Sequence, residues 1–204
     1  AGKTFQEKLG DDYYPANDGE YARFWIMLLW LQQKYGKPWV SNMEVQYNVN
    51  EVKEGMEFIN SLEANHVEPK VSQRQADGVE NGLTNPKWMD GHYAGIFEYE
   101  SGAENNITSV NEDQEVVPGE FLTMEGAKPF GFTKISQGFA ITETSEHKEE
   151  AALLLEFITS NELGVKEMGT QRGIPCNTKA REYLESEGMI SPVVEEAASI
   201  VADT

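Results

Sequence analysis

The sequence predicts an α/β protein in which helices outnumber strands. Three observations support this fold class. Stretches with apolar residues at helical spacing are frequent, the apolar runs that suit strands are few and short, and helices rather than hairpin turns separate these runs. With 204 residues, 39% of them hydrophobic, the chain is long enough to bury a core. We therefore expect a globular fold.

The first strong helix signal starts at Asn17. The run 17–20, Asn-Asp-Gly-Glu, has the form of a capping box in which Asn17 accepts from a first-turn amide and Glu20 reaches back to the backbone. A dense apolar stretch follows, so we expect a helix over 18–35 that is apolar on most sides and central to the fold. Gly36 then offers a left-handed end.

Two further helix starts follow in the next fifty residues. Asn48 and Glu51 form a second capping box, which opens an amphipathic helix that ends near Asn65. Asn85 precedes Pro86, and proline is favoured at the first position of a helix because its missing amide has no partner there in any case. A short helix is therefore expected at this point.

The segment 92–100 is the predicted strand that most suggests a binding site. The pair Asp90-Gly91 supplies a turn before it, and Ala94 and Gly95 remove side-chain bulk so that another backbone can approach closely. The segment ends in an aromatic residue flanked by two carboxylates, which is typical of a binding cleft. The alternative is that its aromatic residues face a core while its carboxylates face water.

The carboxyl-terminal half alternates short strands with helices. After a polar, acidic stretch over 101–115 we expect a strand over 116–119, a strand over 137–142, a helix over 146–159, a helix ending near Met168, and two helices that start at Asn177 and Ser191. Ser145 and the run 159–162 supply caps for the first two helices, and Gly188 ends the third.

The charge of the chain argues against two classes of partner. Lys and Arg number 16 against 35 Asp and Glu, and a net charge of -19 opposes binding to nucleic acid or to an anionic membrane surface. A neutral or cationic ligand fits better. No apolar run is long enough to span a membrane. No secretion signal opens the chain, so either the protein is intracellular or the natural start lies upstream.

Four motifs, taken in order, resemble a known family. They are Trp88-Met89-Asp90-Gly91-His92-Tyr93-Ala94-Gly95-Ile96, with His92 where the family has the lysine of a Gly-Lys-x-Ala pattern; Val116-Val117-Pro118-Gly119; Gly138-Phe139-Ala140-Ile141 with its following helix and the 159–162 corner; and Arg172-Gly173-Ile174-Pro175-Cys176-Asn177. Their order and spacing resemble the extracellular solute-binding proteins (family 1, related to maltose-binding protein) of bacterial carbohydrate ABC transporters.

The resemblance implies a type II periplasmic-binding-protein-like fold, in which two α/β lobes hold a sugar between them. This chain is then a partial one, a helix-rich lobe with a small mixed sheet. Residues 1–137 correspond mainly to the second lobe, 138–177 to a return segment of the first lobe, and 178–204 to helices that return to the second. The resemblance further implies a non-enzymatic, cofactor-free protein outside the membrane, lipid-anchored in its full-length form, with a carbohydrate ligand and a membrane permease as partners.

Sugar recognition needs apolar faces for the C–H side of the ring and carboxylate or amide acceptors for its hydroxyl groups. The residues of these types in the predicted strand end and loops are Glu98, Tyr99, Glu100, Trp88, Asn17, Asp18 and Arg172. Structural roles compete with ligand binding at some of them. Asn17 also suits a helix cap, and Arg172 also suits a surface ion pair in so acidic a chain.

Two other functions remain open from the residues alone. Glu98 and Glu100 lie on one face of the predicted strand, where a retaining glycoside hydrolase could use two carboxylates about 5–5.5 Å apart. A protein-interaction module is the third possibility. The single Cys176 excludes an internal disulfide and a cysteine-based zinc site, and the three histidines lack ligand spacing. Phosphate-loop, dinucleotide and nucleophile-elbow motifs are absent from the sequence.

Overall fold

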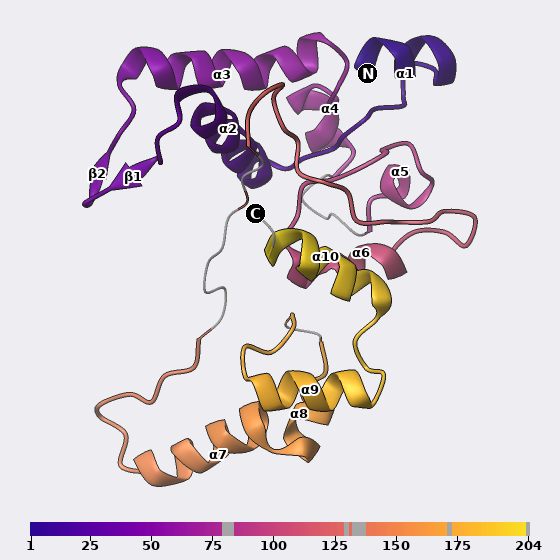
Figure 1. Ribbon diagram of the computed structural model, residues 1–204. Coiled ribbons are helices and arrows are strands. Elements are labelled where there is room, and N and C mark those ends of the chain that lie inside the picture. The colour runs from indigo at the N-terminus through magenta and orange to yellow at the C-terminus, as the bar shows by residue number, and fades with distance from the viewer. Residues whose placement is uncertain (79–83, 129–130, 132–137, 171–172, 203–204) are drawn as a thin grey trace. The chain divides into compact units, whose positions relative to one another are not determined.

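The computed structural model describes residues 1–78, 84–128, 131, 138–170 and 173–202 (Figure 1). The chain forms two compact units. Unit 1 comprises residues 1–98 and 105–131, and unit 2 comprises residues 99–104 and 132–203.

The elements of unit 1 are α1 (Gly2–Leu9), α2 (Glu20–Tyr35), β1 (Val40–Ser41), β2 (Glu44–Val45), α3 (Val49–Ala64), α4 (Val71–Ala76), α5 (Pro86–Met89) and most of α6 (Ala103–Thr108). Those of unit 2 are η2 (Glu100–Gly102), α7 (Lys148–Ser160), α8 (Glu162–Met168), α9 (Thr178–Ser186) and α10 (Pro192–Ala202).

Helix α2 forms the centre of unit 1, as predicted. Its buried residues include four in succession, 26–29, which fits a helix that is apolar on most sides. Gly36 ends it in the left-handed conformation, with φ of 64°. The predicted capping box at Asn17 is wrong, because the cap is Gly19 and it makes no side-chain bond. Asn17 and Asp18 instead face a neighbouring segment of the chain, described below.

Helix α3 packs against α2 along its length. Its predicted capping box is confirmed, since Asn48 Oδ1 accepts from the amides of Asn50 and Glu51 and the Glu51 carboxylate accepts from the Asn48 amide. The two helices approach closely at Gly55, where an added Cβ would lie 2.8 Å from Met27 Cγ. The absence of a side chain at this position therefore sets the distance between the helices.

The short helices α5, α9 and α10 begin where the sequence predicts. Asn85 caps α5 with Pro86 in its first turn, and Asn177 caps α9. One shift occurs at the 159–162 corner, where the cap of α8 is Asn161 rather than Thr159. Helix α7 starts at Lys148 because Ser145 Oγ accepts from the His147 amide and so turns the chain before the helix.

The predicted strand over 92–100 is wrong in extent. It is reduced to one isolated parallel bridge, between Tyr14 and Tyr93. The ladder ends because the Ala16 amide, which would bond Ala94 O next, bonds Val67 O instead. Asn17 then bonds Gly95 O, one residue out of phase with a regular ladder.

Two other predicted strands are also wrong. Residues 116–119, and 138–142 within the predicted strand 137–142, adopt no regular structure, and residue 137 lies outside the described part of the chain. A strand needs a partner to satisfy its backbone, and in the described residues the one sheet is the two-stranded antiparallel pair β1–β2. The predicted polar stretch 101–115 contains a helix, α6.

A cluster of buried charges joins three helices of unit 1. Arg23 on α2 and Arg74 on α4 both contact Glu68 Oε2, at 3.2 and 3.3 Å, and both reach Glu63 on α3, at 2.9 and 3.5 Å. Arg74 also bonds Glu20 Oε1 at 2.9 Å. Arg74 and Glu68 are each 1% exposed, so the pairs are shielded from water and hold α2, α3 and α4 together.

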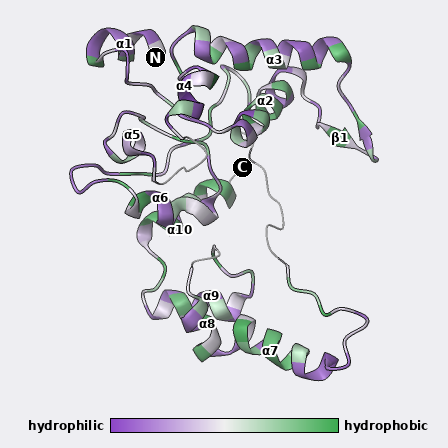
Figure 2. Ribbon diagram, turned by 180° about the vertical axis from the view of Figure 1, so that it is seen from behind, coloured by the Kyte–Doolittle hydropathy of each residue, from purple (hydrophilic) through white to green (hydrophobic). Residues whose placement is uncertain are grey.

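Unit 2 has its own hydrophobic core, formed by Val165, Ala180, Leu184, Ile190 and Val194. The turn from α7 to α8 is tight, because an added Cβ on Gly164 would lie 2.1 Å from the Phe157 carbonyl oxygen. Figure 2 shows hydrophobic residues along α7 and α8, and the large ones among them that are exposed lie on both helices. They are Leu153, Leu154, Phe157 and Leu163.

The predicted fold class is confirmed. The described residues form a helix-rich chain with a small sheet. In the ranges that the structure describes, none of the helices has the length and apolar character needed to cross a membrane.

We predict that Arg74→Ala lowers the free energy of unfolding of unit 1 by about 3–5 kcal/mol, because it leaves buried carboxylates without a partner. All four tryptophans lie in unit 1, so urea unfolding followed by tryptophan fluorescence measures this unit. The control is Lys53→Ala, which removes an exposed pair with Glu57 on α3 of the same unit and should cost about 0.5 kcal/mol or less. Equal losses in the two variants would contradict the role of the buried cluster.

We predict that Gly164→Ala destabilises unit 2 by roughly 1–3 kcal/mol, because a backbone oxygen cannot move aside as a flexible side chain can. Thermal unfolding followed by far-ultraviolet circular dichroism measures the loss. Gly138→Ala is the matched control, since an added Cβ there meets nothing within 4 Å. Wild-type stability of Gly164→Ala would show that the turn can widen freely.

Candidate functional site

Three segments of unit 1 run side by side and end near one another. The Tyr14 amide donates to His92 O at 2.9 Å, and the Ala94 amide donates to Tyr14 O at 3.0 Å. On the other side, the Ala16 amide donates to Val67 O at 3.0 Å. Ligands of open α/β folds commonly bind outside the carboxyl ends of such segments. Here those ends are the residues around 17–18, 68 and 96–98.

Asn17 and Asp18 lie at this end, as predicted, but they are buried. Their exposed fractions are 7% and 4%. Asp18 Oδ1 accepts from the Phe97 amide at 2.6 Å, which ties the end of one segment to the end of the next. Asn17 Oδ1 accepts no hydrogen bond from any residue that the structure describes. An unpaired buried acceptor is costly, so this oxygen is suited to receive a donor from a ligand or a water.

Asp18 and Glu68 are close enough to influence each other's ionisation. Burial raises the pKa of Glu68 to about 8, the negative charge of Asp18 adds to the effect, and Arg23 and Arg74 oppose it. Burial also raises the pKa of Asp18, against the Phe97 amide and the Glu68 side chain. Both shifts favour retention of protons in the folded state, because two carboxylates this deep in the protein are poorly solvated.

Exposed aromatic rings flank this end on the first turns of α2. The exposed fractions of Tyr21 and Phe24 are 54% and 40%. Trp25 contacts both rings edge-on, with centroid distances of 5.7 and 5.5 Å, and Trp39 contacts Phe24 edge-on at 6.2 Å. The helical spacing of Tyr21, Phe24 and Trp25 predicts core packing, and it gives no indication that Tyr21 and Phe24 are exposed. Their position in the first turns after a loop was the available signal.

The other predicted ligand residues are dispersed. Trp88 lies inside α5 with an exposed fraction of 6%, and its indole nitrogen donates to Ser109 Oγ at 2.8 Å. That environment favours packing over stacking on a ligand. Glu98 is exposed at the end of unit 1, whereas Tyr99 is half-buried in unit 2. Arg172 lies outside the described residues.

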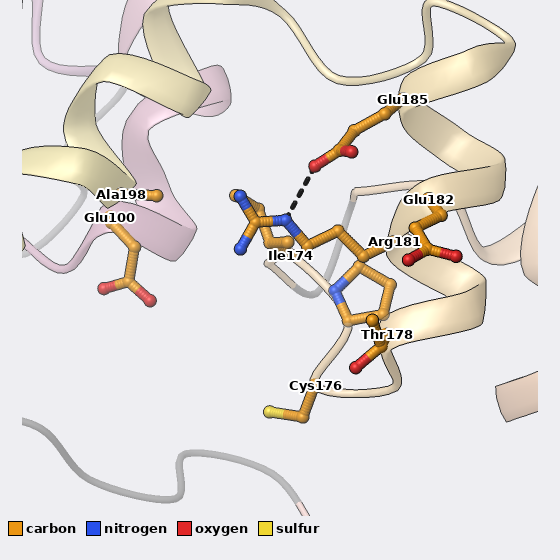
Figure 3. A pocket seen from close by; sticks show the side chains of 9 residues that line it. Glu100, Ile174, Cys176, Thr178, Arg181, Glu182, Glu185 and Ala198 are labelled. Atoms are coloured by element: carbon orange, nitrogen blue, oxygen red, sulfur yellow. Dashed lines mark hydrogen bonds and ion pairs between the residues drawn. The ribbon is translucent and has the colours of Figure 1, made fainter. Parts of the chain in front are cut away.

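Glu100 lines a separate pocket within unit 2, with a volume of about 550 Å³ (Figure 3). The side chain of Arg181 extends from α9 toward the side of the pocket where Glu100 lies, and its Nε donates to Glu185 Oε1 at 2.7 Å. Polar and apolar residues both line the pocket, and the exposed Cys176 is one of them. Among the residues described, no three potential metal ligands cluster.

Comparisons with solved structures find similar folds. A periplasmic solute-binding protein from Pectobacterium atrosepticum has a TM-score of 0.88 and 30% identity, and the match covers 100% of this chain and 52% of that one. A periplasmic oligogalacturonide-binding protein from Yersinia enterocolitica, in complex with saturated digalacturonic acid, has a TM-score of 0.86 and 25% identity, with 98% and 50% covered. No family model and no curated protein matches the chain.

The chain therefore spans about half the length of the solute-binding proteins that it resembles. A de novo designed cysteine esterase is also similar, with a TM-score of 0.77, 23% identity and coverage of 100% of this chain and 51% of that one. At that identity the likeness concerns the fold alone. The structural neighbours with higher identity are binding proteins rather than enzymes.

We predict that the stability of unit 1 falls as pH rises. The pKa of Glu68 is raised from its ordinary value of 4.5 to about 8, so its contribution is complete below about pH 4.5, declines above it, and is lost once pH passes about 8. Urea midpoints from tryptophan fluorescence at pH 5.5 and 8.5 measure the change. In Glu68→Gln the difference between the two midpoints should shrink. A wild-type midpoint that rises with pH over this range would contradict the shift.

Proposed function

We propose that this chain is part of a solute-binding protein that captures a carbohydrate outside the membrane and delivers it to an ABC permease. The observation that most supports the proposal is the combination, at one end of unit 1, of a buried unpaired acceptor on Asn17 with exposed aromatic rings on the first turns of α2. The likeness to a sugar-binding protein of the same fold gives independent support.

The chemistry of this end suits a sugar. A pyranose presents hydroxyl groups around its edge and C–H groups on its faces. Asn17 Oδ1 would accept from a hydroxyl, and the Glu98 carboxylate is the next acceptor along the neighbouring segment. The Tyr21 ring would cover a C–H face at small entropic cost, since an aromatic side chain has few rotatable bonds.

We expect a neutral oligosaccharide rather than a uronate as the ligand. The Yersinia protein was solved with an acidic disaccharide, but this chain carries a net charge of -19. In unit 1, Arg23 and Arg74 are both occupied by carboxylates of the buried cluster. Neither arginine can form the bidentate pair that recognises a carboxylate without breaking that cluster.

The remaining parts of the proposal follow from the two-lobed fold of the resembling proteins. Residues 1–137 and 178–204 would belong mainly to the second lobe and residues 138–177 to the first, with the sugar between the lobes. The protein would act outside the cytoplasm, with a lipid anchor in its full-length form. Capture and delivery require no chemistry on the sugar, so the proposed protein is not an enzyme.

Two alternative functions have weaker support. A glycoside hydrolase would use Glu98 and Glu100, yet in this structure Glu98 ends unit 1 and Glu100 lines a pocket of unit 2 with Arg181. A protein-interaction module would use the exposed apolar residues of α7 and α8. Loss of activity on aryl glycosides in Glu98→Gln would support the first of these alternatives.

We predict that Tyr21→Ala weakens carbohydrate binding by about tenfold, because it removes a stacking surface. Nuclear magnetic resonance titrations of the labelled chain with neutral oligosaccharides and with digalacturonic acid measure the affinities. Tyr13→Ala is the matched control, since Tyr13 stacks on His92 at the opposite end of the same segment. Tighter binding of digalacturonic acid than of every neutral sugar would contradict the proposed ligand class.

We predict that this chain alone binds sugar only weakly, with a dissociation constant above about 1 mM, because it spans half the length of proteins that enclose their ligand between lobes. The same titrations measure it. Micromolar affinity of the isolated chain would show that one wall of the cleft is sufficient.

A further inference from the structure

The buried cluster has an excess of negative charge unless one carboxyl is protonated. Arg23 and Arg74 contribute two positive charges, and Asp18, Glu63 and Glu68 contribute three carboxylates that are buried or half-buried. Glu20 also reaches Arg74, but its side chain is 65% exposed and water solvates it. One proton on the buried carboxyls makes the group neutral, which removes the cost of an uncompensated buried charge.

The hydrogen-bond geometry indicates which oxygen carries that proton. Both arginines contact Oε2 of Glu68, at 3.2 and 3.3 Å. Oε1 of Glu68 is buried and receives no donor from the described residues, while the Glu68 side chain lies within hydrogen-bonding reach of Asp18. A proton held between Glu68 and Asp18 gives the pair a hydrogen bond that two ionised carboxylates cannot form.

Asp18 uses its other bond to hold the neighbouring segment. Its Oδ1 accepts from the Phe97 amide at 2.6 Å, in a position where the parallel backbone ladder has already ended. The residue after Phe97 is Glu98, the exposed candidate acceptor for a sugar hydroxyl. Phe97 also contacts Phe121 edge-on at 6.5 Å, so its ring is packed while its amide is held.

We infer that Asp18 is a positioning residue rather than a ligand contact: it shares one buried proton with Glu68 and holds the Phe97 amide, which fixes Glu98 at the ligand-binding end of unit 1. The charged groups that face this pair are Arg23 and Glu20 from α2, Glu63 from α3 and Arg74 from α4. The importance of Glu98 for affinity rests on the proposed function, whereas the hold on Phe97 does not.

The test measures hydrogen exchange of the Phe97 amide in the full chain without any sugar. In Asp18→Ala, exchange of this amide should become about 10- to 100-fold faster, because a bond to a charged acceptor is lost. In Glu68→Gln it should remain slow, since the glutamine amide donates to Asp18 as the protonated acid does. In Glu68→Ala it should accelerate. Unchanged exchange in Asp18→Ala would overturn the inference.

A control and a second variant separate this effect from a general loss of stability. Asn48→Ala removes the cap of α3 in the same unit, so it should destabilise unit 1 without a selective change at Phe97. If Asp18→Ala does not fold, Asp18→Asn combined with Glu68→Gln is used, which removes both titrating groups of the pair, so the shift of the Phe97 amide proton should no longer change with pH as it does in the wild type. A pH dependence that persists in this double variant would contradict the shared proton.

The outcome is distinguishable from a failure of the proposed function. Slow exchange at Phe97 that depends on Asp18, with no binding of any oligosaccharide, would retain the positioning role and reject the carbohydrate ligand. If sugars do bind, Asp18→Asn should weaken them less than Tyr21→Ala does, because Asn retains an acceptor for the Phe97 amide. Sugar-induced shifts at Asp18 itself larger than those at Glu98 would make Asp18 a direct contact and overturn the inference.

Discussion

The structure of unit 1 depends on the burial of two arginines among carboxylates. Arg23 and Arg74 come from different helices and meet at Glu68, which is itself enclosed. Such a group stabilises only one arrangement of its helices, because any other arrangement leaves a charge without a partner in a poorly solvated interior. The apolar residues of α2 provide the buried surface, and the charged cluster determines how α2, α3 and α4 pack against one another. Helices α2, α3 and α4 are therefore fixed at the end of unit 1 that carries the candidate site.

The geometry of the candidate site therefore depends on the buried packing beneath it as much as on its exposed residues. Asn17 and Asp18 stand at the entry to α2, and the buried cluster lies directly beneath them. The aromatic rings of Tyr21, Phe24 and Trp25 lie on the next turns of the same helix. Because the start of α2 is held rigidly, the Asn17 acceptor and the aromatic rings keep fixed positions relative to each other. This limits the conformational entropy that would be lost on binding a ligand.

Helix starts could be predicted from the sequence, because an N-cap and its first turn are local. Asn48, Asn85 and Asn177 each cap the helix expected of them. Asn17 does not, because a tertiary bond between Asp18 and Phe97 competes with the local one. Strand predictions failed because they too depend on tertiary contacts: an extended segment needs a partner segment, and the sequence does not identify it. The same distinction applies to the candidate site residues. The sequence places Asn17 and Asp18 in a loop before a helix, which is local information. The burial of Trp88 could not be predicted, because it depends on a contact with Ser109, which is distant in sequence.

The exposed apolar residues of α7 and α8 have a consequence for the behaviour of the chain in solution. Leu153, Leu154, Phe157 and Leu163 form a surface on which two copies could associate, and the net charge of -19 opposes their approach. That repulsion acts over about 10 Å at 0.1 M salt and over much shorter distances at higher ionic strength. Colloidal stability therefore comes from the acidic surface of the chain, and added salt weakens it.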